Sequence, residues 1–292
     1  MASFPDAYTD LACEKRGGVR DGRRIEETKE HGFRILTQRA RKKRENGLSE
    51  DDCFITVFAD GMCSLPEEGQ NRLSFLLAKK IRLLGASVLK RKTPPKILVA
   101  GIGNGRMTAD AIGPETAEKI TVTRHLSLLA PDSFRETGSL SVAAIAPGVV
   151  GQTGIETADL IEGAVKAGSP DLILAVDALA SRSLTRLFAT VQLTNNGISP
   201  GSGLKNDRSP LDFARFGVPV IGLGIPTVTS APALIFDFFS AVGEEIGPET
   251  EEKIRKRGER YFVSPKDADQ MLIAASSILA RAADLAFSLG EA

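Results

Sequence analysis

A short apolar run followed directly by a glycine-rich loop is the feature that most constrains how this 292-residue chain can fold. Residues 97–100 (Ile-Leu-Val-Ala) follow two prolines and end at Gly101, which predicts a buried strand. With Gly103 and Gly105 the loop can adopt positive φ and lie close to a ligand. A strand, glycine loop and helix in this order are typical of open α/β sheets, whose sites lie at the carboxyl ends of strands.

The helix predicted after this loop runs from Ala109 to His125, with Thr108 as its N-cap. Asp110 then lies in the first turn of that helix, at the carboxyl end of the preceding strand. His125 is expected to end the helix as a partly buried residue. This unit therefore predicts a carboxylate held next to a flexible backbone loop.

Strands and helices alternate along much of the chain. Apolar runs predict strands at residues 54–58, 140–146, 171–177, 187–193 and 218–223. Helical patterns cover residues 66–84 with Gly85 as the stop, 232–242 and 265–288, and a capping box at Thr153 to Glu156 opens a helix to about Ala167. This order predicts an α/β fold of three layers, with a largely parallel sheet and helices on both of its faces.

Asp177 is the second acid that the pattern singles out. It follows the apolar run 172–176 directly, so a buried strand is expected to hold it at its carboxyl edge. If the strands before Asp110 and Asp177 are adjacent and parallel, both carboxylates reach one crevice. Two close carboxylates do not both ionise easily, so one can keep a proton and polarise a carbonyl while the other activates water. The residues thus predict a candidate acid pair.

Structural explanations compete with this one. Asp110 suits the positive end of a helix dipole, and Asp177 can cap a helix over residues 178–186. A Gly-x-Gly loop after a strand also suits phosphate binding, although Met107 and Thr108 stand where a dinucleotide fingerprint needs its third glycine. Chemistry alone leaves these alternatives open.

Residues close to the two acids are candidates for substrate contacts. Arg182 and Ser183 follow Asp177 and can line the same crevice. A serine nucleophile needs a histidine base, and neither His31 nor His125 has a supporting context. The loop of residues 201–205 is a further candidate for contact with substrate.

Composition narrows the function classes. Lys plus Arg and Asp plus Glu both number 37, so the formal net charge of zero favours neither nucleic acid nor membrane as a partner. No apolar run is expected to span a bilayer, and no signal peptide is recognised at the start of the chain. Three cysteines cannot all pair, which favours reduced thiols in the cytoplasm. With two histidines, neither a zinc site nor any other cofactor is expected.

Several blocks together resemble the family of spore germination proteases, which degrade small acid-soluble proteins that coat spore DNA. The resemblance covers nearly the whole chain. The blocks that carry it are residues 9–14, 101–104, 108–114, 123–126, 146–157, 175–183, 197–203, 217–221, 226–228 and 263–267.

The resemblance implies an endopeptidase with essential aspartates at Asp110 and Asp177. Gly101, Gly103, Asn104 and Thr108 are expected to support this site, and the backbone amides from Gly101 to Asn104 are candidates to hold the substrate or the developing oxyanion. It further implies a zymogen that removes residues 1–10 by cutting between Asp10 and Leu11. A homotetramer in the spore core is expected, with a core similar to that of hydrogenase-maturation peptidases. Residues 11–292 then form a single peptidase domain, with an extension at 11–65 and the core at 66–292.

Two other functions remain possible at this point. A metal-dependent peptidase of the hydrogenase-maturation type would need a third metal ligand, and no histidine lies in a matching block. A non-catalytic nucleotide-binding module would use the glycine loop to hold phosphate.

Overall fold

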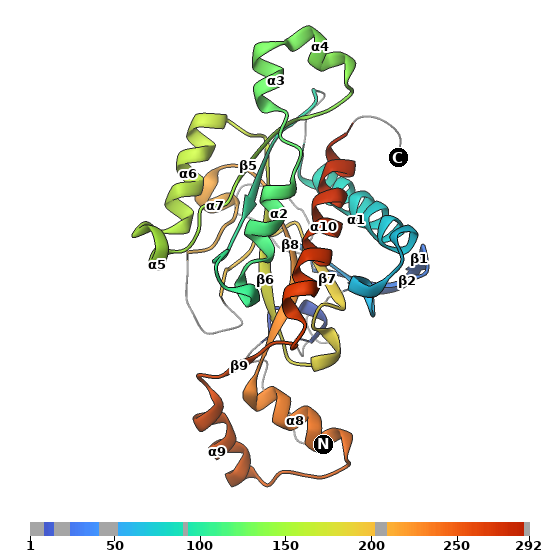
Figure 1. The fold of residues 1–292 in the computed structure, drawn as a ribbon, viewed down its shortest axis with the longest axis vertical. Coiled ribbons are helices and arrows are strands. Elements are labelled where there is room, and N and C mark those ends of the chain that lie inside the picture. Colours follow the sequence, from blue (N-terminus) through green and yellow to red (C-terminus); the bar gives the residue numbers. More distant parts are fainter. Residues whose placement is uncertain (1–8, 15–23, 41–51, 90–92, 202–208, 289–292) are drawn as a thin grey trace.

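A computed structural model describes residues 9–14, 24–40, 52–89, 93–201 and 209–288 (Figure 1). Its strands form one sheet in the order β1-β2-β3-β7-β8-β6-β4-β5, with β9 paired to β8. The strands are β1 (Arg24–Glu30), β2 (Phe33–Ala40), β3 (Asp52–Phe58), β4 (Lys96–Gly101), β5 (Ser141–Ile145), β6 (Leu172–Ser181), β7 (Thr190–Thr194), β8 (Val220–Ser230) and β9 (Phe262–Val263). All six strands predicted from apolar runs are present.

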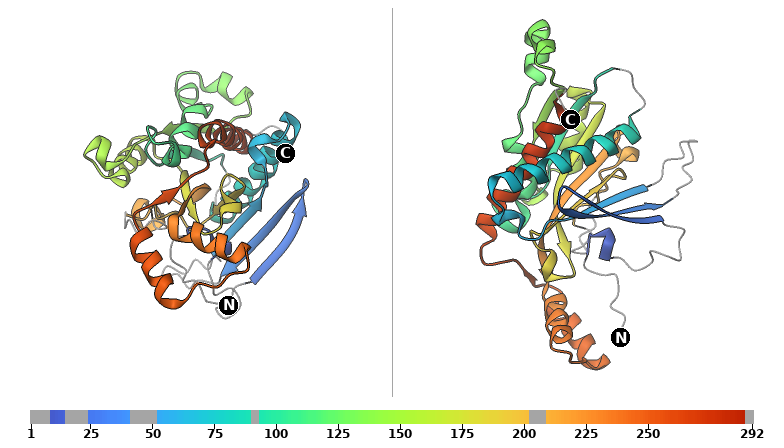
Figure 2. Two further views of the ribbon diagram at one scale, coloured as in Figure 1. Left: turned by 60° about the horizontal axis from the view of Figure 1, so that its bottom comes forward. Right: turned by 90° about the vertical axis from the view of Figure 1, so that its right-hand side faces the viewer.

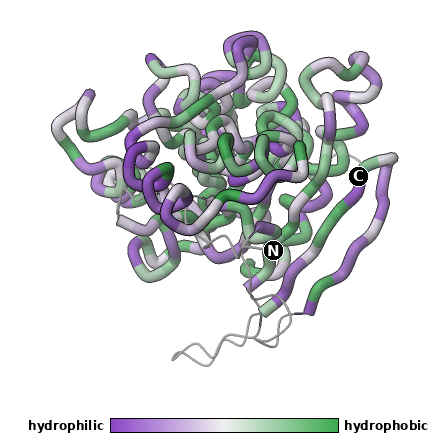
Figure 3. The backbone as a smooth tube through the Cα atoms, turned by 90° about the horizontal axis from the view of Figure 1, so that it is seen from below, coloured by the Kyte–Doolittle hydropathy of each residue, from purple (hydrophilic) through white to green (hydrophobic). Residues whose placement is uncertain are grey.

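The sheet is mixed, so the expectation of a largely parallel sheet is wrong. Strands β5, β4, β6 and β8 run parallel, whereas β1, β2, β3 and β7 pair antiparallel. The hairpin β1–β2 turns at His31 (φ 52°) and Gly32 (φ 90°), and two positive φ values are typical of a two-residue hairpin turn. The polar β1 lies at the sheet edge, where charged side chains discourage further pairing (Figure 3). Strands β1 and β2 were not predicted, because residues 24–40 are rich in charged side chains and show only weak periodicity.

Helices cover both faces of the sheet, as the three-layer prediction requires. One face packs against α1 (Glu67–Val88), α2 (Ile112–Lys119) and α10 (Ala268–Phe287), and the other packs against α6 (Thr157–Gly168) and α7 (Phe213–Phe216). Strand β6 contributes to both layers, since Leu174 and Val176 point to the first and Ile173 and Ala175 to the second. Figure 2 shows α1 and α10 side by side along the first face.

The expectation that no apolar run is long enough to span a bilayer is wrong for helix α10. Its 20 residues are long and apolar enough to cross a bilayer by length and composition. In the fold, however, this helix packs against α1 and α2, with Ala275, Leu279 and Ala282 fully buried. Its apolar character is that of a core helix.

The helix predicted from Ala109 to His125 is interrupted. A 3-10 turn, η3 (Thr108–Asp110), precedes α2, and a separate α3 (Arg124–Leu129) follows it. Thr123 pairs with β5 instead, since its amide donates to the Val142 carbonyl at 2.9 Å and its hydroxyl accepts from the Val142 amide at 2.9 Å. His125 is consequently exposed rather than partly buried.

Other predicted boundaries also move. Helix α1 does not stop at Gly85 but continues to Val88. A Cβ at Gly85 would make only ordinary van der Waals contacts, so close packing does not require glycine at this position. The predicted capping box fails because Thr153 ends a short helix, α5 (Val150–Thr153), and α6 begins only after Glu156.

Two helical arms project from opposite ends of the molecule in Figure 1. One contains α3 and α4 (Pro131–Glu136), and the other contains α8 (Ala231–Ala241) and α9 (Pro248–Gly258). Both arms expose large apolar side chains, among them Leu128, Leu129, Phe238, Val242 and Tyr261.

Candidate active site

Direct backbone contact joins the glycine loop to the start of α2. A Cβ at Gly101 would lie 2.2 Å from the carbonyl oxygen of Gly113. A Cβ at Gly113 would lie 2.2 Å from the Ile102 carbonyl oxygen and 2.4 Å from that of Val176. The Ile102 amide donates to Val176 at 2.7 Å, so the loop leaves the sheet alongside β6. Glycine is therefore needed at positions 101 and 113 for the close approach of these backbones.

Asp110 lies against this loop. Gly103 has a φ of 121°, and a Cβ on it would lie 2.0 Å from the Asp110 backbone oxygen. The Asn104 amide donates to Asp110 Oδ2 at 2.8 Å. From the other side, the hydroxyl of Thr227 on β8 donates to the Ala109 carbonyl at 2.5 Å. Loop and sheet therefore fix both the carboxylate and the backbone that carries it.

Thr108 does not act as the predicted N-cap. Its hydroxyl donates to Asp269 Oδ1 of α10 at 2.5 Å, a contact that spacing along the chain does not reveal. Asp110 accordingly closes η3 and precedes the first residue of α2 by two positions. The position of Thr108 ties η3 to the helical layer.

Asp177 lies inside strand β6 and is only 5% exposed. Val176, the residue before it, pairs with Gly101, the last residue of β4, so Asp177 stands where β4 has left the sheet. Its Oδ1 accepts from the Ala178 amide at 2.9 Å. Because β6 continues to Ser181, Asp177 does not cap a helix, and the helix considered for residues 178–186 is absent. Asp110 follows β4 and Asp177 lies within β6, and these two strands are adjacent and parallel. The expectation that Asp177 stands at the carboxyl end of its strand is wrong, because the strand continues for four more residues.

Gln192 on β7 belongs to the same row of the sheet as Asp177. Both residues pair with Gly224 of β8, one from each side. Residues paired across strands point to the same face, so the two polar side chains flank a glycine. A Cβ at Gly224 would lie 2.7 Å from Leu179 Cγ, which shows that the Leu179 side chain covers this gap.

The N-terminal segment 9–14 crosses this end of the sheet. Asp10 pairs with Ala180 of β6, with its amide donating to the Ala180 carbonyl at 2.9 Å and its Oδ2 accepting from the Ala180 amide at 2.8 Å. Gln192 Nε2 donates to the Asp10 carbonyl at 3.1 Å, and Gln192 Oε1 accepts from the Ala12 amide at 2.6 Å. Leu11 is fully buried. One glutamine side chain thus binds on both sides of the bond between Asp10 and Leu11.

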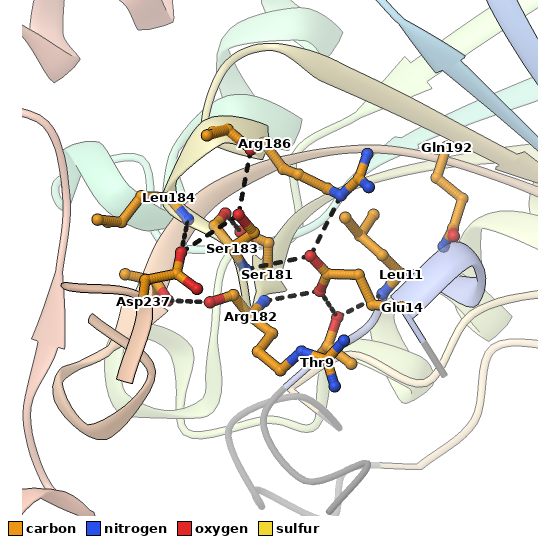
Figure 4. A network of polar contacts seen from close by, with 12 residues as sticks. Thr9, Leu11, Glu14, Ser181, Arg182, Ser183, Leu184, Arg186, Gln192 and Asp237 are labelled. Atoms are coloured by element: carbon orange, nitrogen blue, oxygen red, sulfur yellow. Dashed lines mark hydrogen bonds and ion pairs between the residues drawn. The ribbon is translucent and has the colours of Figure 1, made fainter. Parts of the chain in front are cut away.

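Arg182 and Ser183 line this segment through their backbone (Figure 4). Their amides donate to the Glu14 carboxylate, at 2.7 Å from Arg182 and 3.1 Å from Ser183. The Ser183 hydroxyl lies 3.2 Å from Asp237 Oδ2 of α8 and 3.1 Å from the Thr185 hydroxyl. No histidine contact is found for Ser183 among the described residues, and its hydroxyl contacts Asp237 and Thr185.

All three cysteines carry free thiols. Burial is the main cause that raises the pKa of the Cys13 thiol, although the nearby Arg186 guanidinium acts in the opposite direction. Burial also raises the pKa of Cys63 to about 11. Both thiols therefore remain protonated and poorly nucleophilic at neutral pH.

Three site residues were missed by reasoning from the sequence. Thr227 and Gln152 lie within the blocks that resemble the family, but nothing in the sequence marked their roles. Gln152 Nε2 donates to Asn104 Oδ1 at 2.6 Å and so ties α5 to the glycine loop. Gln192 lies in an ordinary strand and has no sequence signal.

Two further expectations concern loop contacts and metals. Of the expected substrate-contacting loop, residues 202–205 lie outside the described residues. Within the described part of the chain, no three or more His, Cys, Asp or Glu side chains are grouped to hold a metal ion.

Comparison with known proteins identifies the family. Residues 9–264 match the model of the family described as germination protease. Among similar proteins, the germination protease of Caldanaerobacter subterraneus is 34% identical over 313 aligned positions, covering 97% of this chain and 94% of that protein. The germination protease of Oceanobacillus iheyensis is 38% identical, and the alignment covers 84% of this chain and 70% of that protein. The germination protease of Bacillus subtilis is 35% identical, and the alignment covers 82% of this chain and 68% of that protein. The chain is therefore a peptidase that belongs to the germination protease family.

Proposed function

We propose that this peptidase cuts small acid-soluble DNA-binding spore proteins during germination, in the spore core. We further propose that it is made as a zymogen that removes residues 1–10 itself, and that Asp110 and Asp177 activate the attacking water. Family membership supports the substrate class. The module that only binds nucleotides is set aside, because the family is one of peptidases.

The observation that carries the proposal is the position of the bond between Asp10 and Leu11. Gln192 donates to the carbonyl oxygen of this bond at 3.1 Å, and Gln192 shares a sheet row with Asp177. The bond expected to be cut during processing is therefore held on the face of the sheet to which Asp177 points. This arrangement is consistent with a chain that cleaves its own N-terminal segment.

The proposed chemistry needs one protonated and one ionised carboxyl group. The ionised group takes a proton from water as the water attacks the peptide carbonyl, and the protonated group polarises that carbonyl. The amides of Ile102 and Asn104 already donate to Val176 and Asp110. Asn104 therefore supports Asp110, and these two amides do not serve as the oxyanion donors considered for the loop.

The proposed quaternary structure is a homotetramer. The exposed apolar side chains on the two helical arms, such as Leu129 (81% exposed) and Val242 (71% exposed), offer surfaces that a second subunit can bury. Light scattering is expected to give four times the chain mass of 31.1 kDa, and a monomer mass would contradict this part of the proposal.

The test is an incubation of the purified full chain with a small acid-soluble spore protein, with an unrelated unfolded protein as the comparison substrate. Mass spectrometry reads the products and the N-terminus of the enzyme. Discrete cuts in the spore protein and a new N-terminus at Leu11 are expected. Uncut spore protein, once the enzyme begins at Leu11, would refute the substrate assignment. Loss of cutting in a chelator-treated sample would move the mechanism to a metal-dependent one.

A further inference from the structure

Glu14 is a buried carboxylate that the proposed reaction does not use. It is 5% exposed, and its oxygens accept from the amides of Arg182 and Ser183. The Arg186 guanidinium forms an ion pair with it at 3.3 Å, and the Thr9 hydroxyl donates to Oε2 at 2.5 Å (Figure 4). This carboxylate fastens the N-terminal segment to the turn that follows β6.

Cleavage between Asp10 and Leu11 would affect these contacts unequally. The contacts with Arg182, Ser183 and Arg186 lie beyond the cut and are untouched by it. Thr9 lies before the cut and would leave with the released peptide.

The Thr9 hydroxyl bridges Glu14 and the future N-terminus. It accepts from the Leu11 amide at 3.1 Å while it donates to Glu14 Oε2 at 2.5 Å. The Leu11 nitrogen and the Glu14 carboxylate are therefore separated by one hydroxyl group. Departure of Thr9 leaves these two groups facing each other.

Hydrolysis changes the chemistry of the Leu11 nitrogen. The C–N bond breaks, the water oxygen joins the Asp10 carbonyl carbon, and the nitrogen takes up protons to become an ammonium group. An α-amino group has a pKa of about 7.7 to 8.0, so it is largely charged at neutral pH. Because Leu11 is fully buried, this new charge requires a partner.

We propose that the new Leu11 ammonium replaces the Thr9 hydroxyl as the partner of Glu14, and that the resulting ion pair keeps residues 11–14 docked in the mature enzyme. This inference rests on the proposed cleavage between Asp10 and Leu11. Glu14 is then a positioning residue, because it continues to hold the turn of residues 182–186 after the strand that carries Asp177. The contact between the Ala12 amide and Gln192 also survives the cut and favours retention of the segment.

The test uses the mature form directly, so that it does not depend on self-cleavage. A chain that begins at Leu11 is released from an N-terminal ubiquitin fusion and compared with a form that carries one extra glycine before Leu11. The extra residue moves the ammonium by up to about 3.5 Å. Glu14→Gln is introduced into both forms, and Glu68→Gln, at an exposed ion pair with Arg72, is the matched control.

The readout is the rate at which a neutral thiol reagent labels Cys13, located by mass spectrometry. The form beginning at Leu11 is expected to protect Cys13 as the full chain does. The extra glycine and Glu14→Gln are each expected to speed labelling about tenfold or more. Glu14→Gln also removes the ion pair with Arg186, but the extra glycine should have no further effect in that variant, because the ion pair between Leu11 and Glu14 is already absent.

Equal labelling rates in all four forms would overturn the proposal. So would a chain beginning at Leu11 that fails to fold where the full chain folds. The proposed self-cleavage would fail on a different result, namely that the full chain never generates an N-terminus at Leu11. The ion pair between Leu11 and Glu14 would still be tested, because the prepared forms begin at Leu11 without self-cleavage.

Discussion

Asp177 and Gln192 pair with the same residue, Gly224, from its two sides. Two strand spacings separate their backbones by about 10 Å, and both side chains point to the same face of the sheet. Gln192 also donates to the Asp10 carbonyl, which brings the bond after Asp10 into this row. The arrangement links the N-terminal segment to the candidate catalytic acid through one side chain.

Replacement of Gln192 tests this link. Gln192→Met keeps the length of the side chain but removes the donor to Asp10 and the acceptor for Ala12. We expect the appearance of the species beginning at Leu11 to slow by about tenfold to a hundredfold, because the bond loses its orientation. Gln70→Met is the control, since Gln70 on α1 likewise donates to a backbone carbonyl, that of Leu65. An unchanged processing rate in Gln192→Met would contradict the role of this side chain.

Thr227 is predicted to position Asp110. Thr227→Val removes the hydroxyl that holds the Ala109 carbonyl, whereas Thr227→Ser retains it. We expect Thr227→Val to lower kcat by about tenfold or more with little change in KM, because η3 loses its anchor to β8. The carbonyl left without its donor should also cost about 1 to 3 kcal/mol of stability. Full kcat in a folded Thr227→Val protein would argue against this role.

Two glycine substitutions separate close packing from helix propensity. In Gly113→Ala the new Cβ would lie 2.2 Å from the Ile102 carbonyl oxygen, so α2 must move away from β4 and β6. A loss of about 3 kcal/mol or more in the free energy of unfolding is expected. Gly163→Ala, on the exposed side of α6 with no atom within 4 Å of the new Cβ, should instead stabilise the protein by about 1 kcal/mol. Denaturant unfolding measures both, and equal stabilities would contradict the packing argument.

Cys63 makes stability fall in alkaline solution. Burial raises its pKa from the usual 9.0 to about 11, and its Sγ lies 3.5 Å from the Met271 carbonyl oxygen. Between pH 9 and 11 the unfolded chain loses this proton while the folded protein keeps it. The free energy of unfolding therefore falls as pH rises through this window and is unaffected below it. Denaturant unfolding at pH 8, 9 and 10 should show that the free energy of unfolding falls more steeply for wild type than for Cys63→Ala. Parallel curves for the two proteins would contradict this role of Cys63.

Local patterns in the sequence were sufficient for the apolar part of the fold. The strands that contain Ile97 and Leu172 were predicted because burial on both faces leaves a continuous apolar run. The antiparallel β1–β2 hairpin was not, because one of its faces is polar and residues 24–40 show weak periodicity. Helix boundaries failed where a side chain bonds a distant element, as Thr108 does with Asp269 and Thr123 with Val142.

The two acids of the candidate site were predicted from local apolar patterns, whereas the residues that position them were not. Apolar runs precede both Asp110 and Asp177, so the chain order predicts that both residues lie near the ends of adjacent strands, although β6 continues past Asp177 to Ser181. Thr227 and Gln192 act through contacts across strands whose register only the folded sheet defines. The sequence alone does not specify that Gly224 separates Gln192 from Asp177.

The most direct test of the proposed acid pair is the kcat of Asp110→Asn and Asp177→Asn on a small acid-soluble spore protein, measured with chains shown to be folded by their unfolding transitions. Asp171→Asn is the matched control, because Asp171 lies just before the other end of β6 and accepts from the Lys96 amide at 2.9 Å. If the two aspartates form the catalytic pair, kcat falls by about 100-fold to 10,000-fold or more in each of the first two variants and stays near the wild-type value in the control. A folded Asp110→Asn or Asp177→Asn protein that keeps full kcat would contradict the assignment of the acid pair.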